Sequence, residues 1–455
     1  MCHPIDDIRV AFPDGVYSDV RLEQTVDSAI SLRNGELRDV QNRTETGALC
    51  RVHKEGRWYF ASTTDLDRID AILVELAAST ALPAGDAIDL ETLLEANQAD
   101  ARRFDDARVD AAPLGEKLRL VRRYAQSLTR PSIRTWAARW ADQRRDRRFV
   151  SSHGADVRHD YQEAGIILHF TMSDGDQTLS ESYFRAGHWF HELVDDAEAD
   201  IAAMQTFLDR CERFVSSAEP IEPGTATVVM APKVAGVFAH ESFGHKSEAD
   251  FMLGDPAMLE EWHLGKRIGR PLLSIVDSGE PLGSGYMPYD DEGQKTGRTY
   301  LIKDGVLSGR LHAGHTAAAL GEGTTANARA MSFRFEPIVR MTTTWIEPGT
   351  DTVESLLAGV EDGYFIETIK HGSGMSTFTI APGMSWRIRD GKIAEPVRIA
   401  VLTGTVFETM GEIDGLSDTI ERPFLVGGGC GKFDQWPLSV GFGGPHVRVR
   451  AMSVA

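Results

Sequence analysis

The composition and the pattern of apolar residues change near residue 217, which indicates that the chain folds as two parts. Before it, short alternating segments and turn signals mix with amphipathic helical patterns, whereas the chain after it is rich in glycine and strand-like segments. The stretch between them, Ala218-Glu-Pro-Ile-Glu-Pro-Gly224, has the composition of a linker. A chain of 455 residues is long enough for two large domains. We therefore predict an α+β protein with an N-terminal α/β domain at 1–217 and a mainly-β domain at 218–455.

The N-terminal domain is predicted to combine antiparallel hairpins with amphipathic helices. Asn34-Gly35, between two strand-like segments, is a strong signal for a tight hairpin turn. In the helical segments, apolar residues recur every three to four positions. Strands are predicted at 17–23, 29–33, 49–53, 58–62 and within 149–184, and helices at 65–78, 113–128 and 189–215.

The net charge and the cysteine content indicate which partners and which cellular compartment to expect. The 48 Lys+Arg against 68 Asp+Glu give a net charge of −20, which argues against nucleic acid or an anionic membrane and favours cationic or neutral ligands. Cys2, Cys50, Cys211 and Cys430 are too dispersed for a disulfide framework. The first residues lack the features of a signal peptide, and no apolar run is long enough to span a bilayer. We expect a cytoplasmic protein with reduced thiols.

The residues that indicate chemistry open the second domain, in the pattern His240-Glu241-x-x-x-His245. On a regular helix, five residues turn about 500°, so the two imidazoles would point about 140° apart. Binding one metal ion with both therefore requires a locally widened helix or an irregular turn, and Gly244 permits that. Wide helical turns often occur at functional sites.

Zinc chemistry assigns a role to each residue of this pattern. Two neutral imidazoles bind Zn²⁺ while an open position holds water, and Glu241 can take a proton from that water. A catalytic zinc usually has a third protein ligand. Two candidates remain open from the residues alone. Glu248 lies three positions after His245 and would reach the metal if a helix continues, whereas Cys430 lies far away in a glycine-rich segment that allows close backbone approach.

Two familiar catalytic motifs do not fit this sequence. The segment around Cys430 is not a phosphate-binding loop, because Val426 stands where the first glycine should be. Phe433 also follows Lys432, where a serine or threonine is required. A Ser-His-Asp site has no support, because no Gly-x-Ser-x-Gly turn is present.

Two further pairs of residues are weaker candidates. His312 and His315 are a second possible pair of metal ligands, although no carboxylate or cysteine accompanies them in their motif. Arg329 and Arg334 could bind a carboxylate, but surface ion pairs are the simpler expectation for both.

Several segments, in order along nearly all of the second domain, resemble the TldD/PmbA family of zinc metallopeptidases. The first domain is less diagnostic. The matching segments are His240-Glu-Ser-Phe-Gly-His245-Lys-Ser-Glu-Ala-Asp250, Tyr289-Asp-Asp-Glu-Gly293, Arg298-Thr-Tyr-Leu-Ile-Lys-Asp-Gly-Val-Leu-Ser-Gly309, Asn327-Ala-Arg329, Pro337-Ile-Val-Arg-Met341 and Gly429-Cys-Gly-Lys432.

The resemblance implies a zinc ion held by His240, His245 and Cys430, with Glu241 catalytic, and so favours Cys430 over Glu248. It implies hydrolysis of unfolded or modified peptides, with the peptide bound as an added strand in an enclosed cavity. It also implies a dimer, either a homodimer or a heterodimer with a related subunit that lacks the metal motif. Because this chain carries the motif, it resembles the TldD-type subunit.

One residue departs from the family pattern. Asp434 precedes Gln435 where family members usually have a glycine, which could change the charge of the site or its partner contacts.

Two rival functions remain. The first is a zinc-dependent amide hydrolase that acts on a small metabolite conjugate. The second is a non-catalytic binding or scaffold subunit of the same fold, although the four residues His240, Glu241, His245 and Cys430 argue against it.

Overall fold

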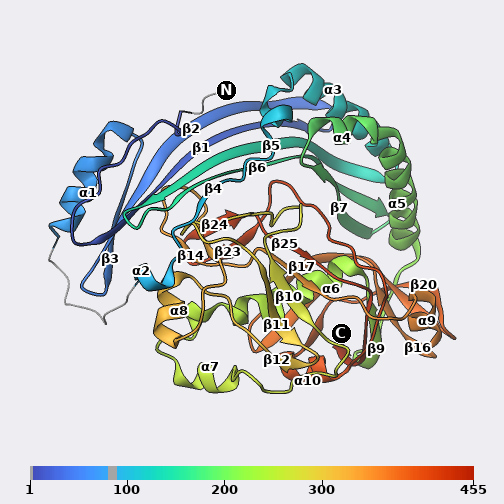
Figure 1. The fold of residues 1–455 in the computed structure, drawn as a ribbon. Helices are drawn as coiled ribbons and strands as arrows, with labels where there is room; N and C mark the ends of the chain where they lie inside the picture. The colour runs from blue at the N-terminus through green and yellow to red at the C-terminus, as the bar shows by residue number, and fades with distance from the viewer. Residues whose placement is uncertain (1–3, 80–89) are drawn as a thin grey trace.

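A long curved sheet from the N-terminal half arches over a second, β-rich body formed by the C-terminal half (Figure 1). The computed structural model describes residues 4–79 and 90–455, so Cys2 lies outside the described residues. Within these ranges, no helix combines the length and apolarity that a membrane span requires. The α+β class predicted from the sequence is confirmed.

The curved sheet has seven strands in the order β3-β2-β1-β5-β6-β4, with β7 paired to β6. All neighbouring strands except β4 and β6 run antiparallel. The strands are β1 (Tyr17–Arg33), β2 (Glu36–Lys54), β3 (Arg57–Thr63), β4 (Gln98–Asp100), β5 (Ile133–Ser151), β6 (Asp156–Asp174) and β7 (Gln177–Gly187).

The predicted turn at Asn34-Gly35 joins β1 to β2, with φ of 47° and 90° as a tight primed turn requires. The predicted separate strands at 17–23 and 29–33 are wrong, because β1 continues through the polar residues between them. Pairing with both β2 and β5 along nearly its full length keeps β1 extended there.

Helices pack on the convex, outer side of the curved sheet, with α3, α4 and α5 near one end and α1 near the other (Figure 1). The predicted helices at 65–78 and 113–128 are confirmed as α1 (Ile69–Ala77) and α3 (Leu114–Ala125), each extended by a short 3₁₀ turn. The predicted helix 189–215 is two helices, α4 (Phe190–Asp195) and α5 (Ala197–Ser217). A short α2 (Leu90–Leu93) precedes β4.

The residues that directly follow α5 belong to the second body. β8 (Glu219–Pro220) lies in the predicted linker and pairs with β20, so this stretch is part of the C-terminal sheet. A ten-stranded sheet runs β17-β18-β21-β26-β9-β16-β19-β20-β8, with β22 paired to β26. Its remaining strands are β9 (Gly224–Met230), β16 (Asp362–Ile366), β17 (Ile369–Gly374), β18 (Thr377–Pro382), β19 (Ser385–Arg389), β20 (Lys392–Arg398), β21 (Leu402–Thr405), β22 (Ile413–Leu416) and β26 (Val447–Val454).

A five-stranded sheet, β12-β11-β10-β15-β25, shares a large apolar core with the ten-stranded sheet. Two short hairpins, β13–β14 and β23–β24, complete the strands. Helix α6 (Pro232–Ala239) packs on β25 and β15. The other elements are β10 (Ile275–Ser278), β11 (Arg298–Lys303), β12 (Val306–Leu307), β13 (Ala328–Arg329), β14 (Ile338–Val339), β15 (Thr343–Ile346), β23 (Cys430–Lys432), β24 (Gln435–Leu438), β25 (Gly441–Gly443), α7 (Pro256–Glu261), α8 (Gly314–Leu320), α9 (Val353–Ala358) and α10 (Val406–Gly411).

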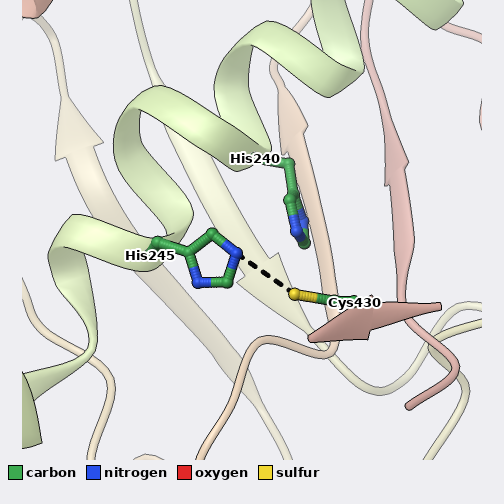
Figure 2. A group of neighbouring side chains, drawn as sticks. All are labelled: His240, His245 and Cys430. Carbon is green, nitrogen blue, oxygen red and sulfur yellow. Dashed lines mark hydrogen bonds between the residues drawn. The ribbon is translucent and has the colours of Figure 1, made fainter. Parts of the chain in front are cut away.

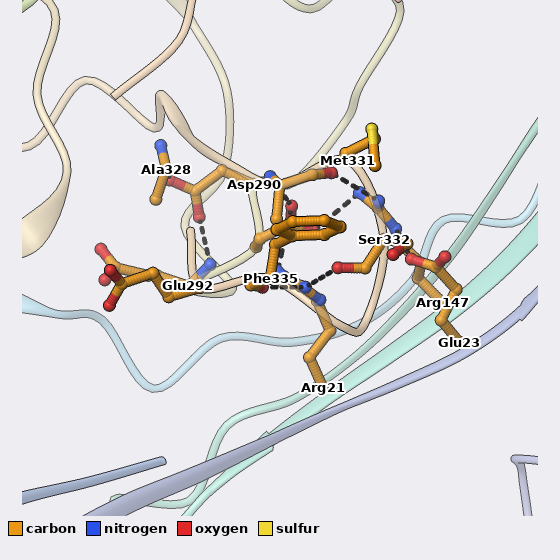
Figure 3. Close-up of polar contacts among 12 residues, drawn as sticks. Arg21, Glu23, Arg147, Asp290, Glu292, Ala328, Met331, Ser332 and Phe335 are labelled. Carbon is orange, nitrogen blue, oxygen red and sulfur yellow. Dashed lines mark hydrogen bonds and ion pairs between the residues drawn. The ribbon is translucent and has the colours of Figure 1, made fainter. Parts of the chain in front are cut away.

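Buried ion pairs join the curved sheet to the second body (Figure 3). Arg147 of β5 donates to Glu23 of β1 at 2.9 Å and to Asp291 of the second body at 2.7 Å. Arg21 forms an ion pair with Asp291 at 3.2 Å and donates to the carbonyl oxygens of Ser332 and Phe335. We call Arg21, Glu23, Arg147 and Asp291 the interface network. Its side chains are at most 8% exposed, so its charges depend on one another rather than on water.

Candidate metal centre

The His240–His245 segment forms the wide helical turn that the spacing of the two histidines requires. Pro232 begins α6, where its missing N–H is tolerated, and the helix widens into a π turn over His240–Gly244. The additional residue in this turn brings the two imidazoles together, with ring centroids 5.0 Å apart. The predicted irregular turn is therefore confirmed.

Gly244 is required here for space rather than for an unusual backbone conformation. Its φ of −54° is ordinary for a right-handed helix. A Cβ at this position would lie 1.8 Å from the Sδ of Met341, closer than any real contact. The wide turn therefore packs tightly against the segment that follows β14, and the glycine makes that packing possible.

Cys430 reaches the two histidines from β23, 185 residues after His245 in the chain (Figure 2). Its Sγ lies 3.1 Å from the Nε2 of His245. Gly429 allows this approach, because a Cβ there would lie 2.3 Å from the carbonyl oxygen of Leu438 on β24. Arg340 anchors the same strand by donating to the carbonyl oxygen of Cys430 at 2.7 Å.

These three side chains fit a metal ion as a donor set. One potential ligand atom from each of His240, His245 and Cys430 lies within 4.8 Å of the others. Tetrahedral zinc with bonds of about 2.0 Å to nitrogen and 2.3 Å to sulfur would place two such atoms about 3.5 Å apart, close to the distance seen here. In addition, the Nδ1 of His240 is buried and has no hydrogen-bond partner among the described residues. A buried ring nitrogen without a partner is costly unless something else satisfies it.

Electrostatics place the thiol of Cys430 in the form that binds metals. Burial alone would raise its pKa, but the neighbouring His240 and His245 outweigh burial and lower the pKa to about 5. A thiolate is the metal-binding form of cysteine. Glu241 is half-buried beside the two histidines, and burial raises the pKa of its carboxyl above the ordinary value. A raised pKa makes this carboxylate a better proton acceptor.

Glu248 lies on the outer side of His245 instead of with the three donor atoms. The helix ends in a 3₁₀ turn over His245–Ser247, and Glu248, which follows it, has an extended backbone. Its carboxylate contacts the Nδ1 of His245 at 3.1 Å and the Nζ of Lys432 at 3.0 Å. Carboxylates in this position commonly orient a metal-binding imidazole and fix which nitrogen carries the proton.

A groove between the two bodies leads to this cluster. A cavity of about 140 Å³ is lined by His240, Glu241 and Cys430. Val237, Leu425 and Phe442 line both this cavity and a larger groove of about 710 Å³, so the two are adjacent. Residues of β7 and β17, each an edge strand of its sheet, line the larger groove. The groove thus offers an extended chain a path to Glu241 beside open strand edges.

The second histidine pair, His312 and His315, lies outside the metal centre. His312 is buried and contacts Thr316 at 3.1 Å and Glu322 at 3.0 Å, so a carboxylate does accompany it. Among the described residues, neither His312 nor His315 belongs to a group of three potential metal ligands.

The two arginine candidates have different environments. Arg334 forms the expected surface ion pair, with Glu45. The same expectation is wrong for Arg329, which is buried and donates to the carbonyl oxygens of Met341 and Ser439. Asp434 is exposed in the turn between β23 and β24 and is not part of the donor set.

Two supporting residues were not singled out from the sequence. Lys432 is buried and donates to Asp250 at 2.6 Å as well as pairing with Glu248. Arg340 holds the backbone of Cys430, as described above. Both lie in segments that resemble the family pattern, but their partners are distant in sequence, so only the fold reveals their roles.

Two nitrogens, a sulfur and a carboxylate at the end of a groove are typical of metal-dependent hydrolases. Comparison with known proteins gives the family. Residues 223–455 match the model of the PmbA/TldA metallopeptidase C-terminal domain, and residues 18–81 match that of PmbA/TldA metallopeptidase domain 1. The chain belongs to this TldD/PmbA family.

Individual relatives agree with this family. A metalloprotease from Synechocystis is 34% identical over 96% of this chain and 94% of its own length. A protein from Saccharolobus solfataricus named zinc metalloprotease TldD homolog is 29% identical over 71% of this chain and 72% of its own length. The structure of TldE from Thermococcus kodakarensis superposes with a TM-score of 0.73 at 16% identity, covering 96% of both chains, which establishes the fold alone.

Proposed function

We propose that this chain is a zinc metallopeptidase that hydrolyses unfolded or modified peptides. The observation that carries the proposal is the convergence of donor atoms from His240, His245 and Cys430 within 4.8 Å of one another, with Glu241 beside them at the end of a groove. The names of the relatives, metalloprotease and zinc metalloprotease, support the same class.

In this proposal, His240, His245 and Cys430 hold the zinc ion. When bound, zinc acts as a Lewis acid and lowers the pKa of water toward neutrality. Glu241 takes the proton from the attacking water on a carboxylate oxygen and passes it to the nitrogen of the leaving amine. Glu248 keeps the imidazole of His245 oriented through Nδ1, and Lys432 balances the charge of Glu248.

The groove favours a peptide over a small metabolite conjugate as the substrate. The groove of about 710 Å³ adjoins the inner cavity, so an extended chain can continue from one into the other. Edge strands at the groove have free backbone groups, so a peptide can bind there as an added strand. Gly372 of β17 lies close to Glu241, since a Cβ on it would be 3.3 Å from the Cγ of Glu241.

We propose a dimer as the working form, either of two copies of this chain or with a related subunit that lacks the metal motif. Phe433 and Trp436 are 72% and 67% exposed on the β23–β24 hairpin that carries Cys430, which supports a partner surface there. Light scattering should give twice the chain mass, or a relative should co-purify. A monomer at micromolar concentration without a co-purifying relative would contradict this part.

A cytoplasmic setting is also part of the proposal. Cys50, Cys211 and Cys430 are free thiols, as a reducing compartment requires.

Peptide hydrolysis by a Glu241→Gln variant tests the proposed function. An unstructured peptide mixture is incubated with each protein, and new amino termini are followed by mass spectrometry. The variant keeps the shape of the side chain and all three metal ligands, so we expect normal zinc content and a rate at least about a hundredfold lower. Full activity in this variant would exclude the proposed role of Glu241. No hydrolysis by zinc-loaded wild-type protein, tested with and without co-purifying partners, would favour a scaffold subunit.

A further inference from the structure

The groove that leads to Glu241 is cationic, although the whole chain has a net charge of −20. Its described lining residues include Arg33, Lys233 and Lys370 but a single acidic residue, Glu181. Glu181 already accepts a hydrogen bond from Thr368 at 2.6 Å, and burial raises the pKa of its carboxyl. The groove therefore favours anionic groups, which is the opposite of what the net charge suggests.

Lys233 differs from the other two cations in its burial. Arg33 and Lys370 are exposed, whereas Lys233 is half-buried in the first turn of α6. Its Nζ lies 4.9 Å from the centroid of the Phe184 ring, on the opposite wall of the groove. Burial lowers the pKa of Lys233, and Glu181 opposes that shift without reaching ion-pair distance. Lys233 makes no hydrogen bond or ion pair with any other described residue, so its ammonium group has bonding capacity for a ligand.

The position of Lys233 relative to Glu241 is set by the helix. Residues four and eight positions apart share a face of a helix, so Lys233, Val237 and Glu241 follow the groove in order. Eight residues of helix rise about 12 Å. An extended peptide covers about 3.3 Å per residue, so this separation equals three to four residues of a bound substrate.

We propose that Lys233 is a specificity-determining residue that binds a carboxylate of the peptide three to four residues from the bond that is cleaved. This inference rests on the proposed peptidase function and names a chemical preference of its substrates. The carboxylate can belong to an aspartate or glutamate side chain or to the C-terminus of the peptide, because the ammonium group recognises the same chemistry in both.

Binding of matched peptides tests this proposal without relying on hydrolysis. Fluorescein-labelled, amidated peptides that differ by one central Glu or Gln are titrated against the Glu241→Gln protein, and fluorescence anisotropy is followed. We expect the Glu peptide to bind about tenfold more tightly, the scale of one charge-assisted hydrogen bond. The preference should weaken at high salt. A third peptide, with Gln and a free C-terminal carboxylate, distinguishes the two sources of the carboxylate.

Variants of Lys233 assign the preference to that residue. Adding Lys233→Met should bring the Glu-to-Gln binding ratio close to one, and Lys233→Glu should favour a matched peptide with a central Lys. Lys392→Met, which removes an exposed lysine that does not line the groove, is the matched control for net charge and should keep the tenfold ratio. Equal binding of the Glu and Gln peptides, or a ratio that survives Lys233→Met, would overturn the proposal.

Cleavage of the same peptides separates this proposal from the proposed function. With wild-type protein, mass spectrometry should place the cut three to four residues from the Glu. Glu241-dependent cleavage without any Glu preference would overturn the role of Lys233 and leave the peptidase in place. A preference for Glu in binding that depends on Lys233, with no cleavage of any peptide, would support the carboxylate site and contradict the peptidase.

Discussion

The metal centre and the interface network are both polar and buried, but they differ in the partners that their acceptor atoms have. In the interface network, Asp291 accepts hydrogen bonds from Arg147 and from the backbone N–H of Ala330, and it forms an ion pair with Arg21. In the metal centre, the Nδ1 of His240 has no partner among the described residues. The thiol of Cys430 has a pKa near 5, which makes it a thiolate at neutral pH. Both carboxylates of the network therefore have cationic partners within the chain, whereas the Nδ1 of His240 has no partner among the described residues.

Burial alone does not distinguish the two sites, because both are buried, but the partners of their acceptor atoms do. A buried charge with charged partners on several sides fixes how two bodies dock, and it gains nothing from a ligand. A cluster of histidine and cysteine donors with an unpartnered nitrogen gains stability when a ligand completes it.

Breaking the interface network should cause the largest loss of stability. Arg147→Met removes a guanidinium that contacts both Glu23 and Asp291 and leaves two carboxylates buried without it. Removing one partner of a buried charge pair costs about 3–5 kcal/mol. Urea unfolding should show this loss, and Arg334→Met, which removes a surface ion pair with Glu45, is the matched control with a loss below about 1 kcal/mol. Equal losses for the two variants would mean that the network is not structural.

Glu248 supports a metal-binding histidine, and changing it should weaken zinc binding without abolishing it. Glu248→Gln keeps the shape but removes the charge that faces the Nδ1 of His245. Loss of a carboxylate that orients a metal ligand lowers metal affinity by about 10- to 100-fold. Competition with a chromogenic zinc chelator measures this affinity. A complete loss of zinc would instead make Glu248 a direct ligand, which was the alternative left open by its position in the sequence.

The interface network should also make stability depend on acid. Burial alone would raise the pKa of Asp291, but Arg147 and Arg21 outweigh burial and hold that pKa below its ordinary value. A carboxyl with a lowered folded pKa contributes stability above the unfolded value of about 4 and loses it as the pH falls through the folded pKa.

The free energy of unfolding of the wild-type protein should therefore decline as the pH is lowered below about 4. Asp291→Asn has no titrating group there and should show a shallower decline, measured by urea unfolding at a series of pH values. Identical slopes for the two proteins would show that Asp291 does not contribute to the acid dependence.

His312 should have the smallest effect on the metal site. Its contacts to Thr316 and Glu322 are complete within the second body. His312→Asn should cost about 1 kcal/mol of stability, the scale of one lost hydrogen bond, and leave the zinc content unchanged. Loss of zinc in this variant would show that this histidine contributes to the metal centre after all.

The two regions also differ in how far the sequence could predict them. The residues around His240, Glu241 and His245 indicate a metal site because their types and spacing are local, and the widened turn follows from helix geometry. The resemblance to the TldD/PmbA family was needed to choose Cys430 over Glu248, since nothing local links residue 430 to the motif.

Strand β5 shows where prediction from local sequence failed. The strand prediction began at 149, but β5 starts at Ile133 and includes Arg144, Arg145, Arg147 and Arg148. Such a run of charges is typical of a solvated segment. In the structure its charges have partners on β1, β6 and the second body, and the partners on β1 and the second body are distant in sequence. Long-range pairing of charges therefore extended a strand that local hydrophobicity does not predict.

The zinc content of Cys430→Ala and Glu241→Gln tests whether His240, His245 and Cys430 together hold a zinc ion. Each protein is purified without a His tag and analysed for metals. We predict about one zinc per chain in the wild type and in Glu241→Gln, because both keep His240, His245 and Cys430. Cys430→Ala should have far less zinc, and excess zinc should restore activity partly in this variant but not in Glu241→Gln. Full zinc occupancy in Cys430→Ala, or folded wild-type protein without zinc, would contradict the account.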